Sequence, residues 1–402
     1  MGKQCRSLSL QISAYLIPGI ENLNILFVHE VQYSTKPVFE MHEFPELLAL
    51  RGHNVGFLDY LEDSSSSNTK PRVHPEAQID FYHVPRRFPG VLGRLLAAAS
   101  ARFDVRRAIT SHKPDVIVLL AVPTLGWHTI SEAKRVNIPV VYRALDISHK
   151  IRKTVFWRLV KLAEQYVYSK ASWVSANNQA LLDYCNRVGR RPTSLGSVDL
   201  PPLNISHFQP RGPYNPAEKE NIAIYMGSFF YFSGLPEFIS GIKKLPRLNF
   251  RLLVAGSGEQ EEKLRDLVTE LELDSVVEFM GFIPFAELPR FFSQAKVAIN
   301  PMLPGLVSNK AFPNKVIQYM AAGIPVVSST LEGLSSIFTD EDLKLAPQTS
   351  DLPRLVSELV EDNLRLTAFS VTAANRISSI FSQTLAVEAF ERTLKKVVHN
   401  GA

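Results

Sequence analysis

Runs of apolar residues alternate with amphipathic, helix-length segments along most of the chain. In the first half, the segment 43–53 has helical spacing and closes at Gly52, between two apolar runs that predict strands. The predicted strands of this half span 24–31, 54–60, 115–122, 138–145 and 172–177. Because strands separated by helices favour a parallel sheet, the first half is predicted to be a Rossmann-like α/β domain.

The alternation stops between Pro201 and Lys219, where prolines resist both helix and central strand, and it then starts again. The strands predicted after this break span 221–227, 249–256, 275–281, 296–302 and 324–329. A second α/β domain is therefore expected. We assign 1–22 to an N-terminal extension, 23–205 to the first domain, 206–220 to a linker, 221–385 to the second domain and 386–402 to a C-terminal helix.

Composition adds few constraints. Hydrophobic residues make up 46% and charged residues 21% of the 402 residues, as in ordinary globular proteins. The two cysteines, Cys5 and Cys185, are far apart and lack metal-ligand spacing, which predicts a reducing, cytoplasmic compartment and no zinc site. No apolar run is long enough to span a bilayer. Asp340, Glu341 and Asp342 are expected to form a turn or a helix cap, so we predict no required metal and no cofactor.

Three segments of the second half carry a family likeness. LLVAGSGEQEEKLRDL, VVEFMGFIPFAELPRFFSQAKVAINP and PNKVIQYMAAGIPVVSS resemble, in order and spacing, the retaining glycosyltransferases of family four. The resemblance extends from Asn24 to Phe390 and is weaker in the first half. It implies the GT-B architecture, in which two Rossmann-like domains face each other across a cleft and the last helix crosses back to the first domain. It also implies that the second domain holds a nucleotide-sugar donor.

The expected donor site lies where the strands of the second domain end. Gly256, Ser257 and Gly258 join a strand to a helix, so their amides can face an anionic group, although a plain tight turn is the alternative. The complete G-x-G-x-x-G pattern is absent because Glu261 occupies the third glycine position, which disfavours a dinucleotide-binding oxidoreductase.

Further donor-binding candidates come from the family motifs. In family members, the residues at the positions of Phe282 and Ile283 hold the nucleobase through backbone contacts; a turn that ends a strand is the alternative. Lys315 begins a predicted helix, where a cation and the helix amides together can neutralise phosphate; a solvated lysine is the alternative. The remaining donor-binding candidates are Gly227, Ser228, Asn314 and Gln318.

The sequence departs from the family pattern at four of its charged positions. The two family glutamates, separated by seven residues, are replaced by Lys310 and Gln318, and the family Arg and Lys that clamp the pyrophosphate are replaced by Ser228 and Ser233. Gln318 can still form a neutral hydrogen bond to a ribose, or it is simply an exposed helix residue. These losses put retention of anomeric configuration in doubt.

The expected catalytic residues follow the strand predicted at 138–145. Asp146 lies where family members place a His-Asp pair, so it is the first candidate for a general base or for orienting the acceptor hydroxyl. Its alternative role is to cap a helix that begins near Ser148. His149 is the second catalytic candidate, and its alternative is an ordinary surface position.

Positive charge is concentrated in two stretches, 85–107 and 148–170, within a chain of net charge +5. Both mix Arg or Lys with aromatic and aliphatic residues at helical spacing, which suits an anionic membrane surface as well as a solvated helix face. No nucleic-acid-binding motif is present. We therefore expect a location at the inner face of the membrane and a lipid-linked or polysaccharide acceptor.

These observations predict a glycosyltransferase that moves a hexose-type sugar from a nucleotide-sugar donor to an acceptor hydroxyl. Two alternatives remain open. One is another enzyme of the same fold, such as a sugar-nucleotide epimerase, and the other is a non-catalytic relative that binds a nucleotide.

Overall fold

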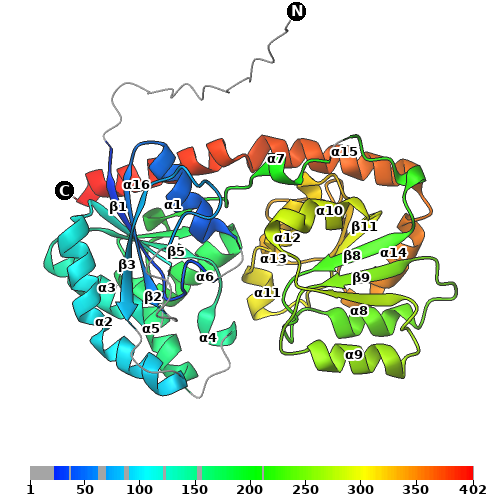
Figure 1. Ribbon diagram of the computed structural model, residues 1–402, viewed down its shortest axis with the longest axis horizontal. Coiled ribbons are helices and arrows are strands. Elements are labelled where there is room, and N and C mark those ends of the chain that lie inside the picture. The colour runs from blue at the N-terminus through cyan, green and yellow to red at the C-terminus, as the bar shows by residue number, and fades with distance from the viewer. Residues whose placement is uncertain are drawn as a thin grey trace, which may run out of the picture.

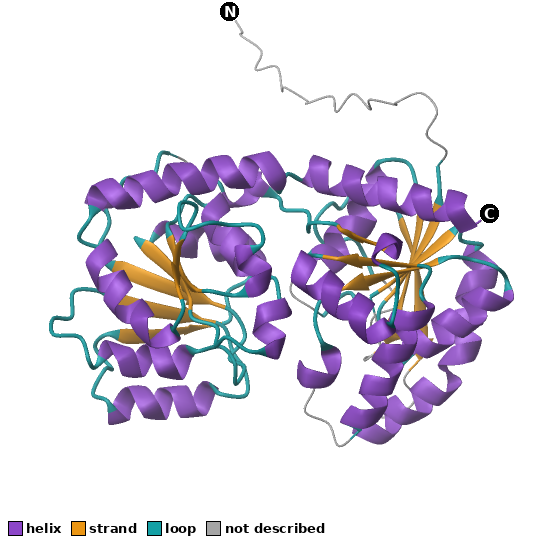
Figure 2. Ribbon diagram, turned by 180° about the vertical axis from the view of Figure 1, so that it is seen from behind, coloured by secondary structure: helices purple, strands orange, loops and turns teal. Residues whose placement is uncertain are grey.

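The computed structural model describes residues 22–35, 38–61, 69–85, 90–120, 124–151, 156–210 and 212–401, without the side chains at 90–92, 94, 95 and 401. Apart from Asn22, the extension predicted for 1–22, with Cys5, lies outside the described residues. Parts of both basic stretches, at 86–89 and 152–155, also lie outside them. Figures 1 and 2 show two lobes, each with its own sheet.

The first domain is built on a seven-stranded parallel sheet in the described part of the chain, in the order β3-β2-β1-β4-β5-β6-β7. Its strands are β1 (Asn24–Val28), β2 (Asn54–Leu61), β3 (Ile79–Pro85), β4 (Val116–Leu119), β5 (Val140–Ala144), β6 (Trp173–Ala176) and β7 (Gly196–Val198). The runs that the sequence predicts as strands are mostly apolar because helices cover both faces of this sheet.

The helices of the first domain divide between these two faces. They are α1 (Glu40–Leu50), α2 (Gly90–His112), α3 (Leu125–Arg135), α4 (Ser148–Ile151), α5 (Trp157–Lys170), α6 (Gln179–Gly189) and the 3-10 turn η1 (Thr193–Leu195). Side chains of α2, α3, α5 and α6 share one core with Leu26 and Val28 of β1. Side chains of α1 share the opposite core with Ile25 and Phe27.

The second domain contains a six-stranded parallel sheet, again within the described residues, in the order β10-β9-β8-β11-β12-β13. Its strands are β8 (Ile222–Met226), β9 (Arg251–Ala255), β10 (Val277–Gly281), β11 (Val297–Asn300), β12 (Val326–Ser329) and β13 (Lys344–Ala346). The sequence pattern does not predict β3, β7 or β13. β3 lies at an edge with half-exposed side chains, whereas β7 and β13 have only three residues each.

The remaining helices belong to the second domain or cross between domains. They are α7 (Ile205–Phe208), α8 (Leu235–Ile242), α9 (Glu261–Glu270), α10 (Leu288–Ser293), α11 (Leu306–Lys310), α12 (Asn314–Ala321), α13 (Glu332–Ser335), α14 (Leu352–Leu359), α15 (Asn363–Ile380) and α16 (Gln383–Gly401). The 3-10 turns are η2 (Pro216–Glu218), η3 (Phe285–Glu287) and η4 (Thr349–Asp351). Phe208 of α7 already packs in the core of the second domain, inside the predicted linker.

The chain crosses between the domains twice, and the two crossings touch. Leu203 pairs with Ser382 in an isolated parallel bridge just before α16 begins. Helix α16 then returns to the first domain, where Phe390 packs against Phe44 with ring centroids 4.5 Å apart. Figure 1 shows α15, α7 and α16 in a row along one side of both lobes. The C-terminal helix thus crosses back to the first domain, as predicted.

A buried polar network fixes this return helix. Arg143 of β5 is 1% exposed and forms an ion pair with Glu40 of α1, with Nε donating at 3.0 Å. Its Nη1 donates to Ser175 Oγ at 2.9 Å and to the Asp199 carbonyl at 2.7 Å. Asp199 in turn accepts from Thr393 of α16 at 3.0 Å. One guanidinium therefore connects α1, β5, β6 and the segment that contacts α16.

We predict that Arg143→Met destabilises the first domain by about 3–5 kcal/mol, because Glu40 would remain buried without its partner. Urea unfolding followed by tryptophan fluorescence measures the loss. The matched control, Arg251→Met, removes an exposed pair with Glu220 and should cost at most about 1 kcal/mol. A loss for Arg143→Met as small as that of the control would contradict this account of the network.

Candidate functional site

A cleft of about 840 Å³ lies between the domains, at the carboxyl ends of both sheets. The first domain lines it with segments that follow β1, β5 and β6, and the second domain with segments that follow β8, β9, β10 and β11. The strand order reverses at β1 in the first sheet and at β8 in the second sheet. Each of these is the first strand of its domain. Ligands of open parallel sheets bind at such reversal points. The topology alone therefore makes this cleft the candidate site.

Glycines bring the loops after β8 and β9 into contact on the second domain's wall. Gly256 has φ +132°, and a Cβ there would lie 1.9 Å from the Gly227 carbonyl oxygen. Gly258 has φ +158°, and its Cβ would lie 2.6 Å from the Phe229 amide nitrogen. Phe229 N–H donates to the Ser257 carbonyl at 2.9 Å. Since no other residue fits this approach, the Gly256–Gly258 turn has a packing role whatever it binds.

The helix after this turn is poorly suited to an anion. The first turn of α9 carries Glu261 and Glu262, whose charges occupy the positive end of the helix dipole. Gly256 and Ser257 line the cleft, whereas Gly258 is not among the lining residues. The prediction that this turn faces phosphate has no independent support here.

Helix α12 offers a better place for an anion. Its first turn contains no acidic residue, and both Asn314 and Lys315 line the cleft. The Asn314 Oδ1 atom is buried and accepts no hydrogen bond within the described structure. Free helix amides and a cation therefore converge on one wall of the cleft, whereas Asn314 Oδ1 offers an acceptor for a donor group of a ligand.

The environment of Lys315 is apolar and aromatic. Its Nζ lies 4.0 Å from the centroid of the Tyr225 ring, and the Tyr225 hydroxyl donates to the Ser228 carbonyl at 3.1 Å. Burial lowers the pKa of Lys315 to about 7, because the charged ammonium has lost solvation. An anion placed beside this nitrogen would restore the stability of the charged form.

The other donor-binding candidates also line the cleft. Gly227 and Ser228 follow β8, and Gln318 lies one helical turn after Lys315. Phe282 and Ile283 follow β10, with Phe282 65% exposed. The structure thus brings together ten of the predicted donor and catalytic positions along the cleft: Asp146, Gly227, Ser228, Gly256, Ser257, Phe282, Ile283, Asn314, Lys315 and Gln318.

Lys310, which replaces a family glutamate, does not line the cleft. Its ammonium pairs with Glu332 of α13, and its carbonyl accepts from Asn178 Nδ2 of the first domain at 2.9 Å. Asn178 also caps α6 by accepting from the Leu181 amide at 2.9 Å. Position 310 therefore has a local role in joining the two domains.

Asp146 faces the cleft from the opposite wall, directly after β5. Its Oδ1 accepts from the Ser148 hydroxyl at 3.1 Å, at the start of the short helix α4. The carboxylate thus combines access to the cleft with a contact to the turn that carries it. Both roles weighed from the sequence are compatible with this position.

His149 is not a surface residue, and it is absent from the cleft lining. Its backbone N–H donates to Glu164 Oε1 of α5 at 3.0 Å, and its Nδ1 pairs with the other carboxylate oxygen. Burial lowers the pKa of His149. The surface alternative is wrong because α5 packs over α4 and supplies a buried carboxylate, which the sequence pattern could not place. This geometry makes His149 an anchor of the turn that holds Asp146.

The sequence analysis missed two carboxyl groups of α1 that line the cleft, Glu40 and Glu43. Glu40 pairs with Arg143, as described above. Burial, with the nearby charge of Glu40, raises the pKa of Glu43 to about 8, so this carboxyl is protonated at neutral pH. Acidic residues three positions apart on the inward side of a helix are the signal that could have revealed them.

Charge is therefore divided between the two walls. Among the described residues that line the cleft, every acid lies on the first domain: Glu30, Glu40, Glu43 and Asp146. The lining residues of the second domain include Lys315 and no acid. Arg72 also lines the first wall, Glu40 is paired with Arg143 and Glu43 is protonated, so the contrast between the walls is chiefly that of Lys315 and Asp146. An anionic ligand is favoured beside Lys315, and a hydroxyl group that donates a hydrogen bond is favoured beside Asp146.

The described residues contain no group of His, Cys, Asp or Glu that could hold a metal ion. Asp340 pairs with Lys344 at 2.7 Å, and Asp342 Oδ2 accepts from the Thr339 amide at 2.9 Å, so both carboxylates serve a turn. In the part of the chain that the structure describes, no helix has the length and apolar character needed to cross a bilayer.

Comparison with known proteins places this site in a family context. Residues 209–376 match the family described as "Glycosyl transferases group 1". A putative colanic acid biosynthesis glycosyltransferase, WcaL, of Escherichia coli is 30% identical over 138 residues, which cover 34% of each chain. The alignment thus spans about one third of the length of this relative.

Solved structures extend the likeness to the whole fold. Sucrose-phosphate synthase from Thermosynechococcus elongatus superposes with a TM-score of 0.79 at 16% identity, covering 94% of this chain and 99% of the other. Anabaena Alr3699/HepE, in complex with UDP and glucose, superposes with a TM-score of 0.73 at 17% identity, covering 93% and 100%. The chain therefore has the predicted GT-B fold, and residues 209–376 match the group 1 glycosyltransferase family.

Proposed function

We propose that this protein is a glycosyltransferase that uses a nucleoside diphosphate sugar and transfers a hexose-type sugar to an acceptor hydroxyl. The observation that carries the proposal is the pairing of Lys315 and the free end of α12 on one wall with Asp146 on the other. One wall suits the diphosphate, and the other suits the hydroxyl that attacks. Support also comes from the group 1 family match and from the UDP and glucose bound by the HepE structure.

The donor diphosphate would accept hydrogen bonds from the amides of α12 and from Lys315. The exposed Phe282 and the adjoining Ile283 offer a surface for the base, and Gln318 offers an amide for the ribose. A neutral amide at Gln318 and a single lysine would replace the charged contacts that the family pattern leads one to expect.

The acceptor hydroxyl would enter from the first domain's wall. Its oxygen would form a bond to the anomeric carbon, while the bond between that carbon and the phosphate oxygen breaks and the nucleoside diphosphate leaves. The hydroxyl proton would pass to Asp146. Stabilisation of the departing diphosphate by Lys315 and the helix amides would replace a metal ion in this step.

The acceptor is proposed to be a saccharide or a lipid-linked saccharide. WcaL is named for colanic acid biosynthesis, and another relative is named an O-antigen chain mannosyltransferase. A lipid-linked acceptor would be presented at a membrane surface, and the basic helices α2 and α5 supply charge for contact with such a surface.

A non-catalytic nucleotide-binding role is the second candidate, because Ser228 and Ser233 replace the cations of the family clamp. Thermal shift assays with UDP-, GDP- and ADP-sugars, followed by assays of transfer and hydrolysis, distinguish the two. The proposal expects stabilisation by one donor class together with turnover. Stabilisation without turnover would support the second candidate, and no stabilisation by any donor would refute both.

We predict that Lys315→Met weakens donor binding by about ten-fold to a hundred-fold, since it removes a charge-assisted contact to phosphate. Donor affinity of the unaltered protein should fall as the pH rises from 6 to 8.5. Free Lys315 loses its proton near pH 7, whereas the bound diphosphate raises its pKa, so binding takes up a proton. Isothermal titration calorimetry at several pH values measures both effects.

The matched control is Lys310→Met, which removes a lysine that pairs with Glu332 outside the cleft. Its donor affinity and pH dependence should equal those of the unaltered protein. A pH dependence that persists in Lys315→Met would show that another group takes up the proton.

We predict that Asp146→Asn lowers kcat by at least about a hundred-fold and leaves donor affinity unchanged, because the amide cannot accept the proton. Transfer assays and calorimetry provide the two readouts. Asp183→Asn, an exposed carboxyl on α6, is the control and should retain full turnover. Normal turnover in Asp146→Asn would restrict this residue to holding the β5–α4 turn.

A further inference from the structure

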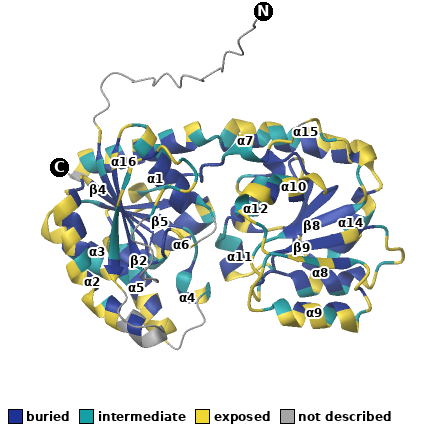
Figure 3. Cartoon of the chain, viewed as in Figure 1, coloured by how far each residue is buried: buried dark blue, intermediate teal, exposed yellow. Residues whose placement is uncertain are grey.

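The outer surface of α2, α3 and α5 carries a feature that sugar transfer in the cleft does not require. These three helices pack side by side on one face of the first sheet, and Trp127 of α3 stacks on Tyr166 of α5 with ring centroids 4.0 Å apart. Their inner sides fill the core, so their outer sides face away from the sheet. Figure 3 shows exposed positions along these helices.

Large apolar side chains are exposed on this outer surface. The exposed fractions are 69% for Phe103, 49% for Trp127, 44% for Trp157, 62% for Leu159 and 57% for Leu162. Single exposed apolar residues are common, but several on adjoining helices indicate an interaction surface. The three- and four-residue spacing of Leu159, Leu162 and Tyr166 places them along one side of α5.

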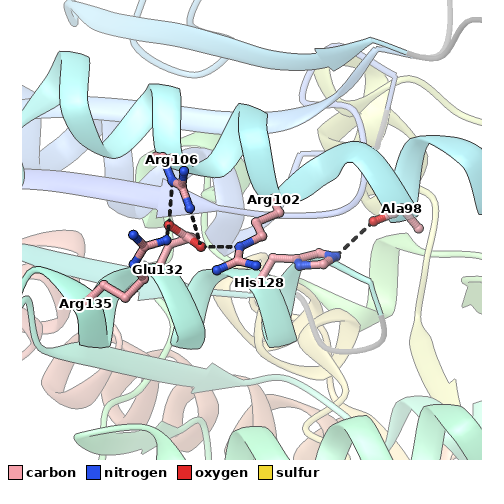
Figure 4. A network of polar contacts seen from close by, with 6 residues as sticks. All are labelled: Ala98, Arg102, Arg106, His128, Glu132 and Arg135. Atoms are coloured by element: carbon pink, nitrogen blue, oxygen red, sulfur yellow. Dashed lines mark hydrogen bonds and ion pairs between the residues drawn. The ribbon is translucent and has the colours of Figure 1, made fainter.

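Three arginines lie on α2 and α3, which also carry exposed apolar residues, and Figure 4 shows how the arginines are held. Glu132 of α3 accepts from Arg102 Nε at 2.5 Å and from Arg106 Nε at 2.8 Å, and Arg135 Nη1 lies 3.5 Å from it. The carboxylate is nearly buried, whereas the three arginines are about half exposed. Hydrogen bonds, first from Arg106, lower the pKa of Glu132 to about 2.

This cluster retains a positive charge, because one carboxylate faces three guanidinium groups. Each guanidinium has five N–H donors, so donors remain for a further anion. The network also joins α2 to α3, as does the hydrogen bond between His128 Nε2 and the Ala98 carbonyl at 2.9 Å. The arginines are therefore held on α2 and α3, the helices that carry Phe103 and Trp127.

Basic residues exceed acidic ones over the whole surface. Besides the cluster, the described basic side chains of the three helices are Arg107, Lys134, Arg158, Lys161 and Lys170. The other acids of these helices are Asp104 and Glu164, and Glu164 is buried against His149. We name the set Arg102, Phe103, Arg106, Trp127, Arg135, Trp157, Arg158, Leu159, Lys161 and Leu162 the basic-apolar face.

We propose that the basic-apolar face binds the surface of an anionic phospholipid bilayer. Its aromatic and leucine side chains would enter the interfacial layer, while its arginines would contact the lipid phosphates. Nucleic acid would use the charges but leave Leu159 and Leu162 without a role. A second copy of the chain would bring the arginine clusters together and repel. Charge complementarity and exposed apolar area together favour the lipid surface.

Bilayer contact at this face would serve sugar transfer to a lipid-linked acceptor, a use that rests on the proposed function. Helix α4 packs against α5, and its Ser148 and Ile151 line the cleft. In Figure 1, α4 lies between α5 and the second domain. The α5 edge of the basic-apolar face is thus the part that adjoins α4 and the cleft, and a lipid-linked acceptor would reach Asp146 from that edge of the bilayer contact.

Vesicle flotation of the full chain tests the inference. We expect binding to vesicles of phosphatidylcholine and phosphatidylglycerol in equal parts, and little binding to phosphatidylcholine alone. The pair Leu159→Ser and Leu162→Ser should lower the partition coefficient by about ten-fold or more, because two exposed apolar contacts are lost. The pair Arg158→Gln and Lys161→Gln should also weaken binding and reduce its dependence on salt.

Matched controls lie on the second domain and use equally exposed positions. Leu364→Ser with Val371→Ser on α15, and Lys243→Gln with Lys244→Gln after α8, should leave vesicle binding unchanged. Circular dichroism checks that each variant is folded. No binding to anionic vesicles, or unchanged binding of the Leu159 and Leu162 pair, would overturn the inference.

Other ligands of the basic-apolar face would give different results in these experiments. Stabilisation by inorganic phosphate without vesicle binding would show an anion site and overturn the bilayer assignment. A dimer in sedimentation that becomes a monomer in the Leu159 and Leu162 variant, without vesicle binding, would assign the face to self-association. Vesicle binding without sugar transfer would support the bilayer inference and refute the proposed function. Transfer to a soluble acceptor without vesicle binding would support the proposed function and refute the bilayer inference.

Discussion

The packing of α16 on the first domain is the constraint on which the shared cleft depends. Phe390 lies against Phe44 in the core, and Thr393 donates to Asp199, which belongs to the network of Arg143. Arg51 adds an ion pair to Glu391 at 2.7 Å. Because the chain enters the second domain and leaves it at the same place, these contacts hold the carboxyl ends of the two sheets opposite each other. A site composed of both walls follows from that arrangement.

Within the cleft, the decisive feature is a half-buried lysine whose ammonium lies against an aromatic ring. Lys315 lies over the Tyr225 ring, and its pKa is lowered because the ammonium has lost water without gaining a carboxylate. A charge in this state is stabilised strongly by an incoming anion. Asp146 is on the opposite wall, so an anion beside Lys315 and an acceptor hydroxyl beside Asp146 would lie on different walls. Under the proposed function, this arrangement would let a cleft that lacks the usual family cations bind a diphosphate.

The sequence predicted the fold well, since continuous apolar runs such as 24–31 are the direct result of burial on both faces of a parallel sheet. It did not predict β3, whose half-exposed edge position allows Asp80 and His83 within the strand. The family motifs brought most site candidates to the cleft, because motif residues follow strands whose ends meet. Glu40, Glu43 and the Glu164 partner of His149 were missed. Their positions depend on how α1 and α5 pack, and periodicity does not specify those contacts.

The position of a bound diphosphate tests the central claim most directly, and a crystal structure of the protein with UDP would show it. The account predicts that the diphosphate lies at the first turn of α12, within hydrogen-bonding distance of Lys315 Nζ and on the opposite side of the cleft from Asp146. A diphosphate bound at the start of α9, beside Gly256 and away from Lys315, would contradict it.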